Sequence, residues 1–359
     1  MPWREMKQKD KKKTKRWTGK IKNVHLPDIE ILDEIKEKAE FKASRISTKA
    51  NQSYKEGLKL VQGRIMEIKS NYRYIVEING ELVTAKMSGR LKQFLYQSHT
   101  IAAVGDFVAV DVANNSDKRI EKILPRRSAL IRYGKGSFQK EIILAANIDQ
   151  VIITSSWRKP RFKAGLIDRY LCIVAIQNLK PIIVINKIDL LEDEQELKEQ
   201  TAYYEAMGYP LICTSVVNGT GMQELKELLK NKDSVFTGHS GTGKTSLINY
   251  LEPSLNLPTA EVSDRNEKGK HTTSQSILIP WSFGGHLLDT PGIKTITLHR
   301  EDKEHIPKVF PGFERLYSKC KFSDCRHINE DGCAVLEAME EGIIPYERYD
   351  SYQYLYASL

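Results

Sequence analysis

The segment Gly238–Thr245, which reads GHSGTGKT, fits the pattern G-x-x-x-x-G-K-[ST] and follows a short apolar run. Glycines in this pattern let backbone N–H groups close around phosphate oxygens at the start of a helix. Lys244 would then reach the outer phosphates and Thr245 would hold Mg²⁺. An ordinary glycine-rich turn is the alternative. The other residues expected to line this phosphate loop are Gly238, His239, Ser240, Gly241, Thr242, Gly243 and Ser246.

A second motif indicates which nucleotide base the chain binds. An Asn-Lys-x-Asp sequence directly follows the apolar run Pro181–Ile185. Its aspartate can accept both the N1–H and the exocyclic amine of guanine, a pairing that adenine does not offer, and a site built on such a pair rejects analogues that lack it. The lysine stem would pack on the base, the asparagine would anchor the loop, and a plain loop is the alternative. The motif consists of Asn186, Lys187, Ile188 and Asp189.

The order of these motifs is unusual, because the guanine motif precedes the phosphate loop, whereas Ras-like chains begin with that loop. Strand-like and helix-like runs alternate from residue 147 onward, which predicts a parallel sheet that binds its ligand at the carboxyl ends of the strands. Ser215, placed to offer a backbone N–H to the guanine carbonyl, lies 29 residues after Asn186, and Asp289 lies 45 residues after Lys244. These intervals suit the ordinary fold, so we predict a circularly permuted Ras-like GTPase domain. Permutation is tolerated when native termini lie close together.

Two further motifs follow the phosphate loop: GKHTT at 269–273, and DTPG, which begins at Asp289. The Asp289 carboxylate can join the Mg²⁺ shell, and the N–H of Gly292 can meet the γ-phosphate. Either Thr272 or Thr273 can complete the Mg²⁺ shell while the γ-phosphate is present. The sequence leaves open which threonine acts. The loop would then have two states and behave as a switch.

The residue that usually orients the attacking water in Ras-like enzymes is absent from this sequence. Ras-like enzymes place a glutamine just after this second motif, whereas this chain has Ile293. Intrinsic GTP turnover is therefore expected to be slow. His271, in the first switch, is the candidate to orient water when RNA orders the loop. A solvent-exposed loop histidine is the alternative.

Short alternating segments between residues 58 and 124 predict five strands, each with one buried face. Asn79-Gly80 favours a tight hairpin, because both residues tolerate positive φ. A small barrel results, either an OB-fold, which commonly binds oligonucleotides, or an SH3-like barrel. The expected strands are Leu58–Ile68, Tyr72–Ile78, Glu81–Met87, Asp106–Val112 and Arg119–Leu124.

Three of the five cysteines gather near the C-terminus with a histidine, in the spacing C-x4-C-x-H-x5-C. Three thiolates and an imidazole suit tetrahedral Zn²⁺, and four protein ligands leave no open position. We therefore predict one structural Zn²⁺, with unpaired buried cysteines as the alternative. The expected ligands are Cys320, Cys325, His327 and Cys333.

Charge indicates the kind of partner. The net charge is +9 and the pI is about 9.1, which favours polyanions such as nucleic acid. Residues 1–57 are expected to form a basic arm and linker, partly disordered, that either adds salt-dependent phosphate contacts or is a solvated tail. No apolar run approaches the roughly 18 residues of a membrane span. We expect a cytoplasmic monomer with no membrane partner.

Together these motifs resemble ribosome small subunit-dependent GTPase A, a bacterial ribosome-assembly family, over about residues 58–345. The resemblance implies a multidomain chain that combines α/β and all-β parts: an OB-fold-like barrel at 58–130, a circularly permuted GTPase domain at 140–298 and a zinc-binding domain with C-terminal helices at 299–359. GTP or GDP with Mg²⁺ and one Zn²⁺ would be bound.

The resemblance also implies a partner and a cycle. The barrel and the zinc domain would contact the small ribosomal subunit and its rRNA near the decoding region. Hydrolysis of GTP, stimulated by the subunit, would drive release during late maturation. The alternative is an RNA-binding assembly chaperone in which GTP is mainly a structural or regulatory ligand. A metabolic kinase is disfavoured, because the guanine motif has no role in it.

Overall fold

The computed structural model describes residues 58–69, 73–89, 91, 102–114, 117–133, 141–258, 276–289 and 297–359. The chain divides into the units Met1–Leu58 and Lys59–Leu359, and every described residue except Leu58 belongs to the second unit. The predicted basic arm at 1–57 lies outside the described residues. Among the described residues, no helix is both long enough and apolar enough to cross a membrane.

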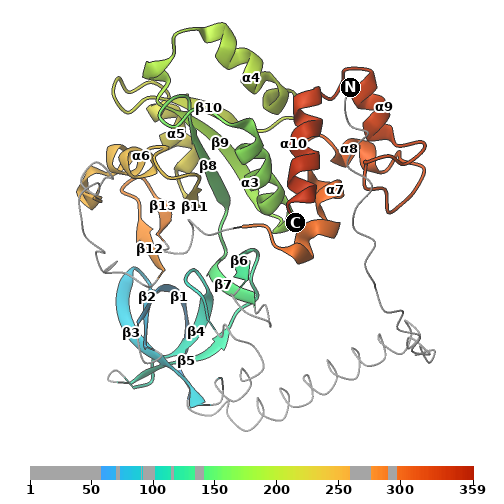
Figure 1. Ribbon diagram of the computed structural model, residues 1–359. Coiled ribbons are helices and arrows are strands. Elements are labelled where there is room, and N and C mark those ends of the chain that lie inside the picture. The colour runs from blue at the N-terminus through green and yellow to red at the C-terminus, as the bar shows by residue number, and fades with distance from the viewer. Residues whose placement is uncertain are drawn as a thin grey trace, which may run out of the picture. The chain divides into compact units, whose positions relative to one another are not determined.

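The first five strands form a closed barrel (Figure 1). Strand β1 pairs with both β2 and β4, while β3 pairs in parallel with β5. Asn79 and Gly80 have φ of 53° and 84°, as the β2–β3 hairpin requires. An OB-like barrel is thereby confirmed. Its strands are β1 (Leu60–Lys69), β2 (Arg73–Ile78), β3 (Glu81–Met87), β4 (Phe107–Asp111) and β5 (Lys118–Ile123).

A short hairpin, β6 (Ala129–Tyr133) with β7 (Glu141–Ala146), follows the barrel. A parallel sheet comes next, in the order β10-β9-β8-β11-β13, with β12 antiparallel at its edge. This arrangement confirms the predicted strand–helix alternation. The strands are β8 (Gln150–Ser156), β9 (Lys180–Asn186), β10 (Leu211–Thr214), β11 (Lys232–Thr237), β12 (Ile277–Pro280) and β13 (Gly285–Asp289).

Side chains of alternate residues in β8 point to opposite faces of this sheet. Ile152 joins the cluster beneath α5 (Met222–Leu229) and α6 (Lys244–Leu251). Val151 and Ile153 join the cluster beneath α3 (Ala164–Ile176) and α4 (Glu194–Ala206). All three side chains are at most 1 % exposed, so the sheet is covered on both faces and its ligand must approach from the ends of the strands.

The barrel and the parallel sheet are joined by backbone pairing. Strand β1 pairs antiparallel with β12, where Glu67 lies opposite Ile277. Close by, Arg64 donates to the carboxylate of Asp233 at 2.5 Å, and His286 Nδ1 lies 2.7 Å from the other oxygen of the same carboxylate. Hydrogen bonds and an ion pair therefore join the two folds.

The C-terminal region consists of short helices and an ordered loop. Phe310, Phe313 and Tyr352 are fully buried and pack together, and α10 (Tyr346–Ala357) contacts α3, which covers the parallel sheet. This region therefore continues the hydrophobic core on the α3 side of the sheet. Its helices are η5 (Arg300–Glu304), α7 (Ile306–Val309), α8 (Glu314–Tyr317), α9 (Ala334–Glu340) and α10 (Tyr346–Ala357).

Candidate nucleotide and metal sites

The predicted phosphate loop joins the end of β11 to the start of α6. Gly238 and Gly243 have φ of 136° and 89°, which side chains rarely adopt. A Cβ on Gly238 would lie 2.1 Å from the carbonyl oxygen of Thr154, and one on Gly243 would lie 2.3 Å from Nδ2 of Asn186. Only glycine fits at these two positions, because neighbouring strands crowd the loop.

Lys244 begins α6 and folds back over the loop. Its Nζ donates to the carbonyl oxygens of Gly238 at 2.8 Å and His239 at 2.7 Å. The adjacent Thr245 and Ser246 occupy the first turn of the helix and are half-buried. A phosphate at this helix N-terminus would meet both the loop amides and the lysine ammonium.

The guanine motif leaves the end of β9 and is tied to the phosphate loop. Asn186 donates from Nδ2 to the Thr242 carbonyl at 3.1 Å, and its Oδ1 accepts from Thr214 at 3.2 Å. Lys187 donates to the Gly241 carbonyl at 2.7 Å. The two loops, which are more than fifty residues apart in sequence, are therefore held as one unit.

Asp189 is exposed, and one of its carboxylate oxygens accepts a 2.6 Å hydrogen bond from the hydroxyl of buried Ser215. Ser215 in turn accepts from the backbone N–H of Val217 at 3.2 Å. These bonds orient the carboxylate, while its exposure leaves it accessible to a base. Ile188 of the same loop is half-buried and packs against the hydrophobic core.

Asp289 is the last residue of β13, and β13 lies beside β11, the strand that leads into the phosphate loop. The predicted Mg²⁺ carboxylate is therefore brought to the same end of the sheet as Thr245. The other predicted switch residues, His271, Thr272, Thr273, Gly292 and Ile293, lie outside the described residues.

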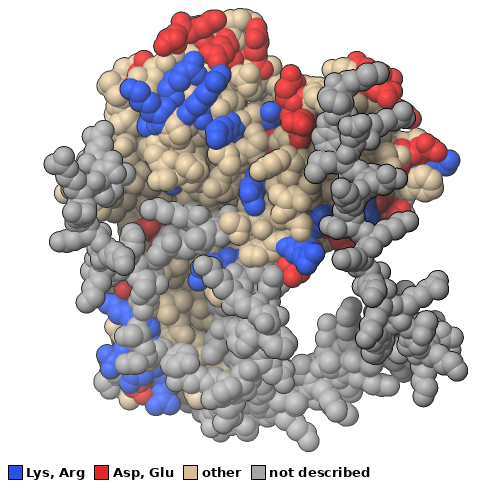
Figure 2. Space-filling model, in the orientation of Figure 1, with Lys and Arg blue, Asp and Glu red and all other residues tan. Residues whose placement is uncertain are grey.

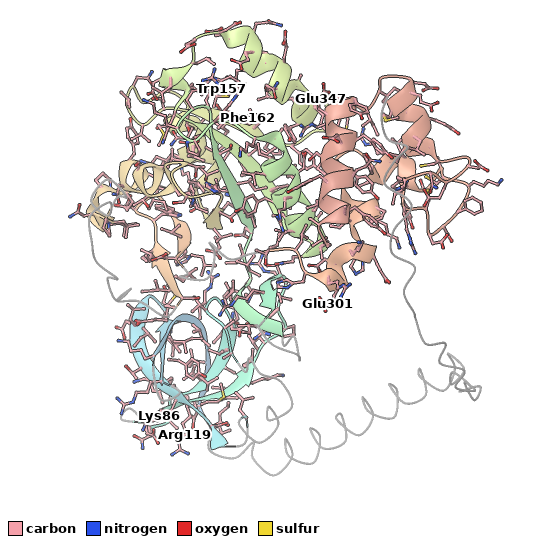
Figure 3. The ribbon with its side chains drawn as sticks, in the orientation of Figure 1. Lys86, Arg119, Trp157, Phe162, Glu301 and Glu347 are labelled. Atoms are coloured by element: carbon pink, nitrogen blue, oxygen red, sulfur yellow. The ribbon has the colours of Figure 1, made fainter. Side chains whose placement is uncertain are left out.

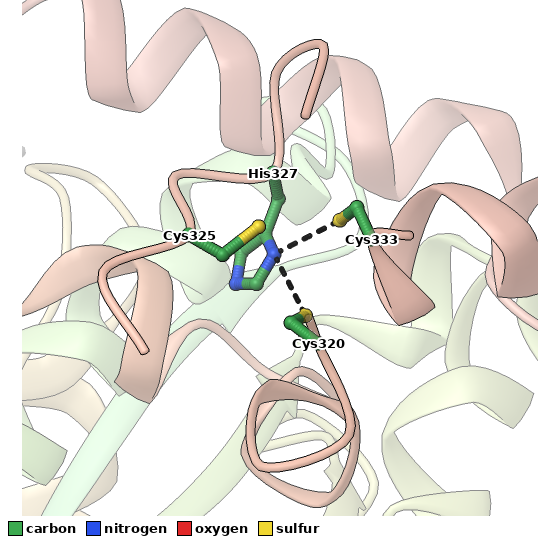
Figure 4. A group of neighbouring side chains, drawn as sticks. All are labelled: Cys320, Cys325, His327 and Cys333. Carbon is green, nitrogen blue, oxygen red and sulfur yellow. Dashed lines mark hydrogen bonds between the residues drawn. The ribbon is translucent and has the colours of Figure 1, made fainter. Parts of the chain in front are cut away.

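The four predicted metal ligands come together in the C-terminal loop (Figure 4). One ligand atom from each of Cys320, Cys325, His327 and Cys333 lies within 4.8 Å of the other three. His327 Nδ1 lies 3.2 Å from the Cys333 sulfur and 3.7 Å from the Cys320 sulfur. Zn–S bonds of about 2.3 Å and Zn–N bonds of about 2.0 Å would fit such a cluster.

The Pro307 carbonyl and the burial of the imidazole both favour His327 as a metal ligand. Its Nε2 lies 3.1 Å from the Pro307 carbonyl, so an Nε2–H donated to that oxygen leaves Nδ1 free to bind a metal. Burial lowers the pKa of the imidazole, which favours the neutral form that ligates metals. Burial also raises the pKa of the Cys325 thiol to about 12, so a cation is needed to stabilise its thiolate.

Two contributors to the nucleotide site were not predicted. Thr214 holds the side chain of Asn186, and the Lys159 carbonyl accepts from Lys187 at 2.5 Å. The position of Thr214, directly before Ser215 at the end of a strand, could have indicated it. Nothing in the sequence around Lys159 marks a backbone carbonyl as a partner. This loop, between Trp157 and Phe162, lies at the nucleotide end of the sheet (Figure 3).

A phosphate loop bound to a guanine-reading loop that precedes it in the chain defines a circularly permuted GTPase. The family model described as RsgA GTPase matches residues 123–299. A relative in Caldanaerobacter subterraneus subsp. tengcongensis, "Small ribosomal subunit biogenesis GTPase RsgA", is 36 % identical over 292 residues, covering 81 % of this chain and 93 % of that protein. The chain therefore belongs to the RsgA GTPase family and is a GTP-hydrolysing enzyme, as the sequence predicted.

Another relative and two solved structures support the same family assignment. A protein of the same name in Haemophilus influenzae is 41 % identical over 242 residues, which cover 67 % of this chain and 69 % of that one. Among solved structures, YjeQ from Thermotoga maritima has a TM-score of 0.68 at 31 % identity, covering 84 % of this chain and 99 % of that one. YloQ, titled a circularly permuted GTPase, has a TM-score of 0.64 at 27 % identity, covering 85 % of this chain and 96 % of that one.

Proposed function

We propose that this chain is a GTPase of small ribosomal subunit biogenesis, which binds the immature subunit and its rRNA with GTP and leaves on hydrolysis. The observation that carries the proposal is the 36 % identity across 93 % of a relative whose name states that role. The positive net charge is consistent with an RNA partner. We also propose that the protein acts in the cytoplasm as a monomer.

The described residues support specific roles in the nucleotide site. Asp189 would accept the N1–H and amine of guanine, with its carboxylate oriented by Ser215. Lys244 would move from the loop carbonyls to the outer phosphates, because a phosphate offers it a full negative charge in place of neutral acceptors. Thr245, in the first turn of α6, and Asp289, at the end of β13, would complete the Mg²⁺ shell from the same end of the sheet.

The roles proposed for the switch residues rest on sequence. Either Thr272 or Thr273 would join the Mg²⁺ shell, and the N–H of Gly292 would meet the γ-phosphate. His271 would orient the attacking water once RNA orders its loop, since Ile293 offers no polar group for that purpose. Turnover would therefore be slow for the free enzyme and faster on the subunit.

We further propose that Cys320, Cys325, His327 and Cys333 hold one structural Zn²⁺. The tight grouping of ligand atoms and the Pro307 contact of His327 support this assignment. Four protein ligands leave no position for a substrate, so the ion would stabilise the C-terminal region and take no part in hydrolysis.

Multiple-turnover GTP hydrolysis, measured with and without small subunits, tests the proposal, with large subunits as the control. Stimulation by small subunits alone is expected, together with co-sedimentation that is stronger with a non-hydrolysable GTP analogue than with GDP. An unstimulated rate would favour the assembly chaperone in which GTP is a structural or regulatory ligand. Equal stimulation by large subunits would refute the choice of partner.

A further inference from the structure

The segment between β8 and α3 folds against the nucleotide site. The backbone N–H of Trp157 donates to the carbonyl of Asn186, in the guanine motif, at 2.9 Å. The N–H of Phe162 donates to the Trp157 carbonyl at 3.1 Å, which closes the segment into a loop. Both rings are buried, and their centroids lie 5.7 Å apart. We call residues 156–162 the Trp157 loop.

The charged side chains of the Trp157 loop face solvent. Lys159 and Arg161 are exposed, and Figure 2 shows lysine and arginine side chains gathered over the part of the surface where Figure 3 places Trp157. Arg158 lies over the Trp157 ring and 3.1 Å from the Glu196 carboxylate, but both members of this ion pair are partly exposed. Ion pairs near the surface contribute little to a conformation. The buried groups of the loop therefore set its shape.

One of these buried groups is the hydroxyl of Ser156. Its Oγ donates to the Pro160 carbonyl at 2.8 Å, and the residue is 1 % exposed. Between them lies Lys159, whose φ of 51° is uncommon for a residue with a side chain. A turn in such a conformation depends on the contacts that hold it. Ser156 therefore holds the turn at residues 159–160 from the inside.

The turn that Ser156 holds contacts both loops of the nucleotide site. The Lys187 ammonium donates to the Lys159 carbonyl at 2.5 Å as well as to the Gly241 carbonyl at 2.7 Å. A Cβ on Gly241 would lie 3.4 Å from Cδ of Pro160, so the proline ring lies against the phosphate loop. The turn therefore supports the guanine motif through a hydrogen bond and the phosphate loop through packing.

The two carbonyls that accept from Lys187 matter because its stem is proposed to pack on the guanine ring. A free lysine stem has many rotamers, and the loss of that freedom when a ligand binds reduces affinity. With its ammonium held by two carbonyls, the stem of Lys187 is fixed at both ends before the nucleotide arrives. This preorganisation should slow the dissociation of bound nucleotide.

We propose that the Trp157 loop is a third loop of the nucleotide site, and that Ser156 is a positioning residue which slows nucleotide dissociation through Lys187. Ser156 acts on Lys187 through the turn at Lys159 and Pro160. The inference rests on the proposed role of Lys187 in the guanine site and is independent of the small-subunit partner. It assigns the Trp157 loop a role in retaining nucleotide, in addition to joining β8 to α3.

The test measures how fast a fluorescent GDP analogue leaves the full chain when excess GDP is added. Ser156→Ala should raise the dissociation rate about fivefold, the effect of one lost neutral hydrogen bond, and change the association rate less than about twofold. The preference for GDP over IDP, which lacks the exocyclic amine, should not change, because Asp189 accepts that amine and is oriented by Ser215.

The neighbouring serine supplies a matched control. Ser155 is half-buried, and its hydroxyl makes no hydrogen bond within the part of the chain that the structure describes, so Ser155→Ala should leave the dissociation rate unchanged. Equal increases in the two variants would overturn the proposal, because any change at the end of β8 would then have the same effect. An unchanged rate in Ser156→Ala would also overturn it.

A double-mutant cycle tests whether Ser156 acts through Lys187. Lys187→Met keeps the stem, removes the ammonium and should itself raise the dissociation rate about fivefold or more. In that background Ser156→Ala should add less than about 1.5-fold, because the contact that it supports is already lost. A full fivefold increase in both backgrounds would overturn the proposal, since Ser156 would then act by another route.

Two further readouts keep the test decisive. Both serine variants should melt within about 4 °C of the wild type; if Ser156→Ala fails to fold, Ser156→Cys, which keeps a weak donor, should raise the dissociation rate about twofold, and a wild-type rate would overturn the proposal. An unchanged rate in Lys187→Met would refute the proposed role of Lys187 in the guanine site. A raised rate in Lys187→Met with none in Ser156→Ala would refute only the role of the Trp157 loop.

Discussion

Replacing Arg348 with methionine should loosen the C-terminal region from the GTPase domain. Arg348 on α10 donates to the carboxylate of Asp168 on α3 at 2.6 Å, and that carboxylate also accepts from Ser351 at 2.8 Å and Tyr204 at 2.7 Å. Asp168 is fully buried, so methionine would leave a buried charge without its counter-ion. Breaking a buried pair in this way costs about 3–5 kcal/mol of the free energy of unfolding.

The cost should depend on pH in a definite direction. Burial raises the pKa of the Asp168 carboxyl, while Arg348 and hydrogen bonds from Tyr204 and Ser351 oppose that rise. Without Arg348 the folded-state pKa rises further above its unfolded value near 3.9, so protonation favours the folded variant. The stabilising effect of protonation is complete below the unfolded pKa and is lost as the pH rises through the folded one. The loss of stability caused by Arg348→Met should therefore be larger at pH 8 than at pH 5.5. Between the unfolded-state and folded-state pKa values of Asp168 in the variant, this loss should grow by up to about 1.4 kcal/mol for each unit of pH.

The free energy of unfolding at each pH can be measured by urea titration followed by tryptophan fluorescence, because Trp157 and Trp281 are both buried in the GTPase domain. Arg315→Met, on an exposed arginine of the same region, is the control and should cost within about 0.5 kcal/mol. Asp168→Asn combined with Arg348→Met should recover much of the loss by removing the buried charge. A penalty below about 1 kcal/mol, or one equal at both pH values, would refute the reasoning.

Three further changes test the sites. Asp189→Asn should weaken GTP binding by about 3 kcal/mol or more, over a hundredfold by equilibrium titration, because two charge-assisted hydrogen bonds to guanine are lost; wild-type affinity would contradict the assignment. Cys333→Ser should reduce bound zinc, measured by mass spectrometry, from one equivalent to substoichiometric and lower the melting temperature, whereas the same change at Cys172, a buried residue outside the cluster, should leave the zinc content unchanged. His271→Ala should bind GTP normally but lose subunit-stimulated hydrolysis, and unchanged stimulated turnover would exclude the role of His271 in orienting water.

The sequence predicted the nucleotide-binding half well, because its motifs are local and each ends a strand. Once β9 and β11 lie in one parallel sheet, their carboxyl ends meet, and Asn186 and Thr242 come together without further information. The grouping of Cys320, Cys325, His327 and Cys333 was predictable for the same reason, since all four lie within fourteen residues. Positions of the switch residues, the finer domain boundaries and the roles assigned to individual site residues stay predictions.

Features that depend on contacts between distant segments were not predicted. Arg64 and Asp233 are 169 residues apart, and Asp168 and Arg348 are 180 apart, so neither residue of a pair indicates its partner. The β6–β7 hairpin was missed because its strands are short and lack clear alternation. The alignment of Lys69, Arg73, Lys86 and Arg119 across the barrel was not predicted either, because these residues come into register only after the pairing of four strands is set.

The pairing of β12 with β1 has a consequence for solubility. Strand β12 is the outermost strand of the GTPase sheet, and an uncovered edge strand presents N–H and C=O groups that can pair with another molecule. In this chain the barrel occupies that edge, where Glu67 meets Ile277. The barrel therefore also shields this edge of the enzyme domain from self-association, and a GTPase fragment released from its barrel would expose β12 as an unpaired edge strand.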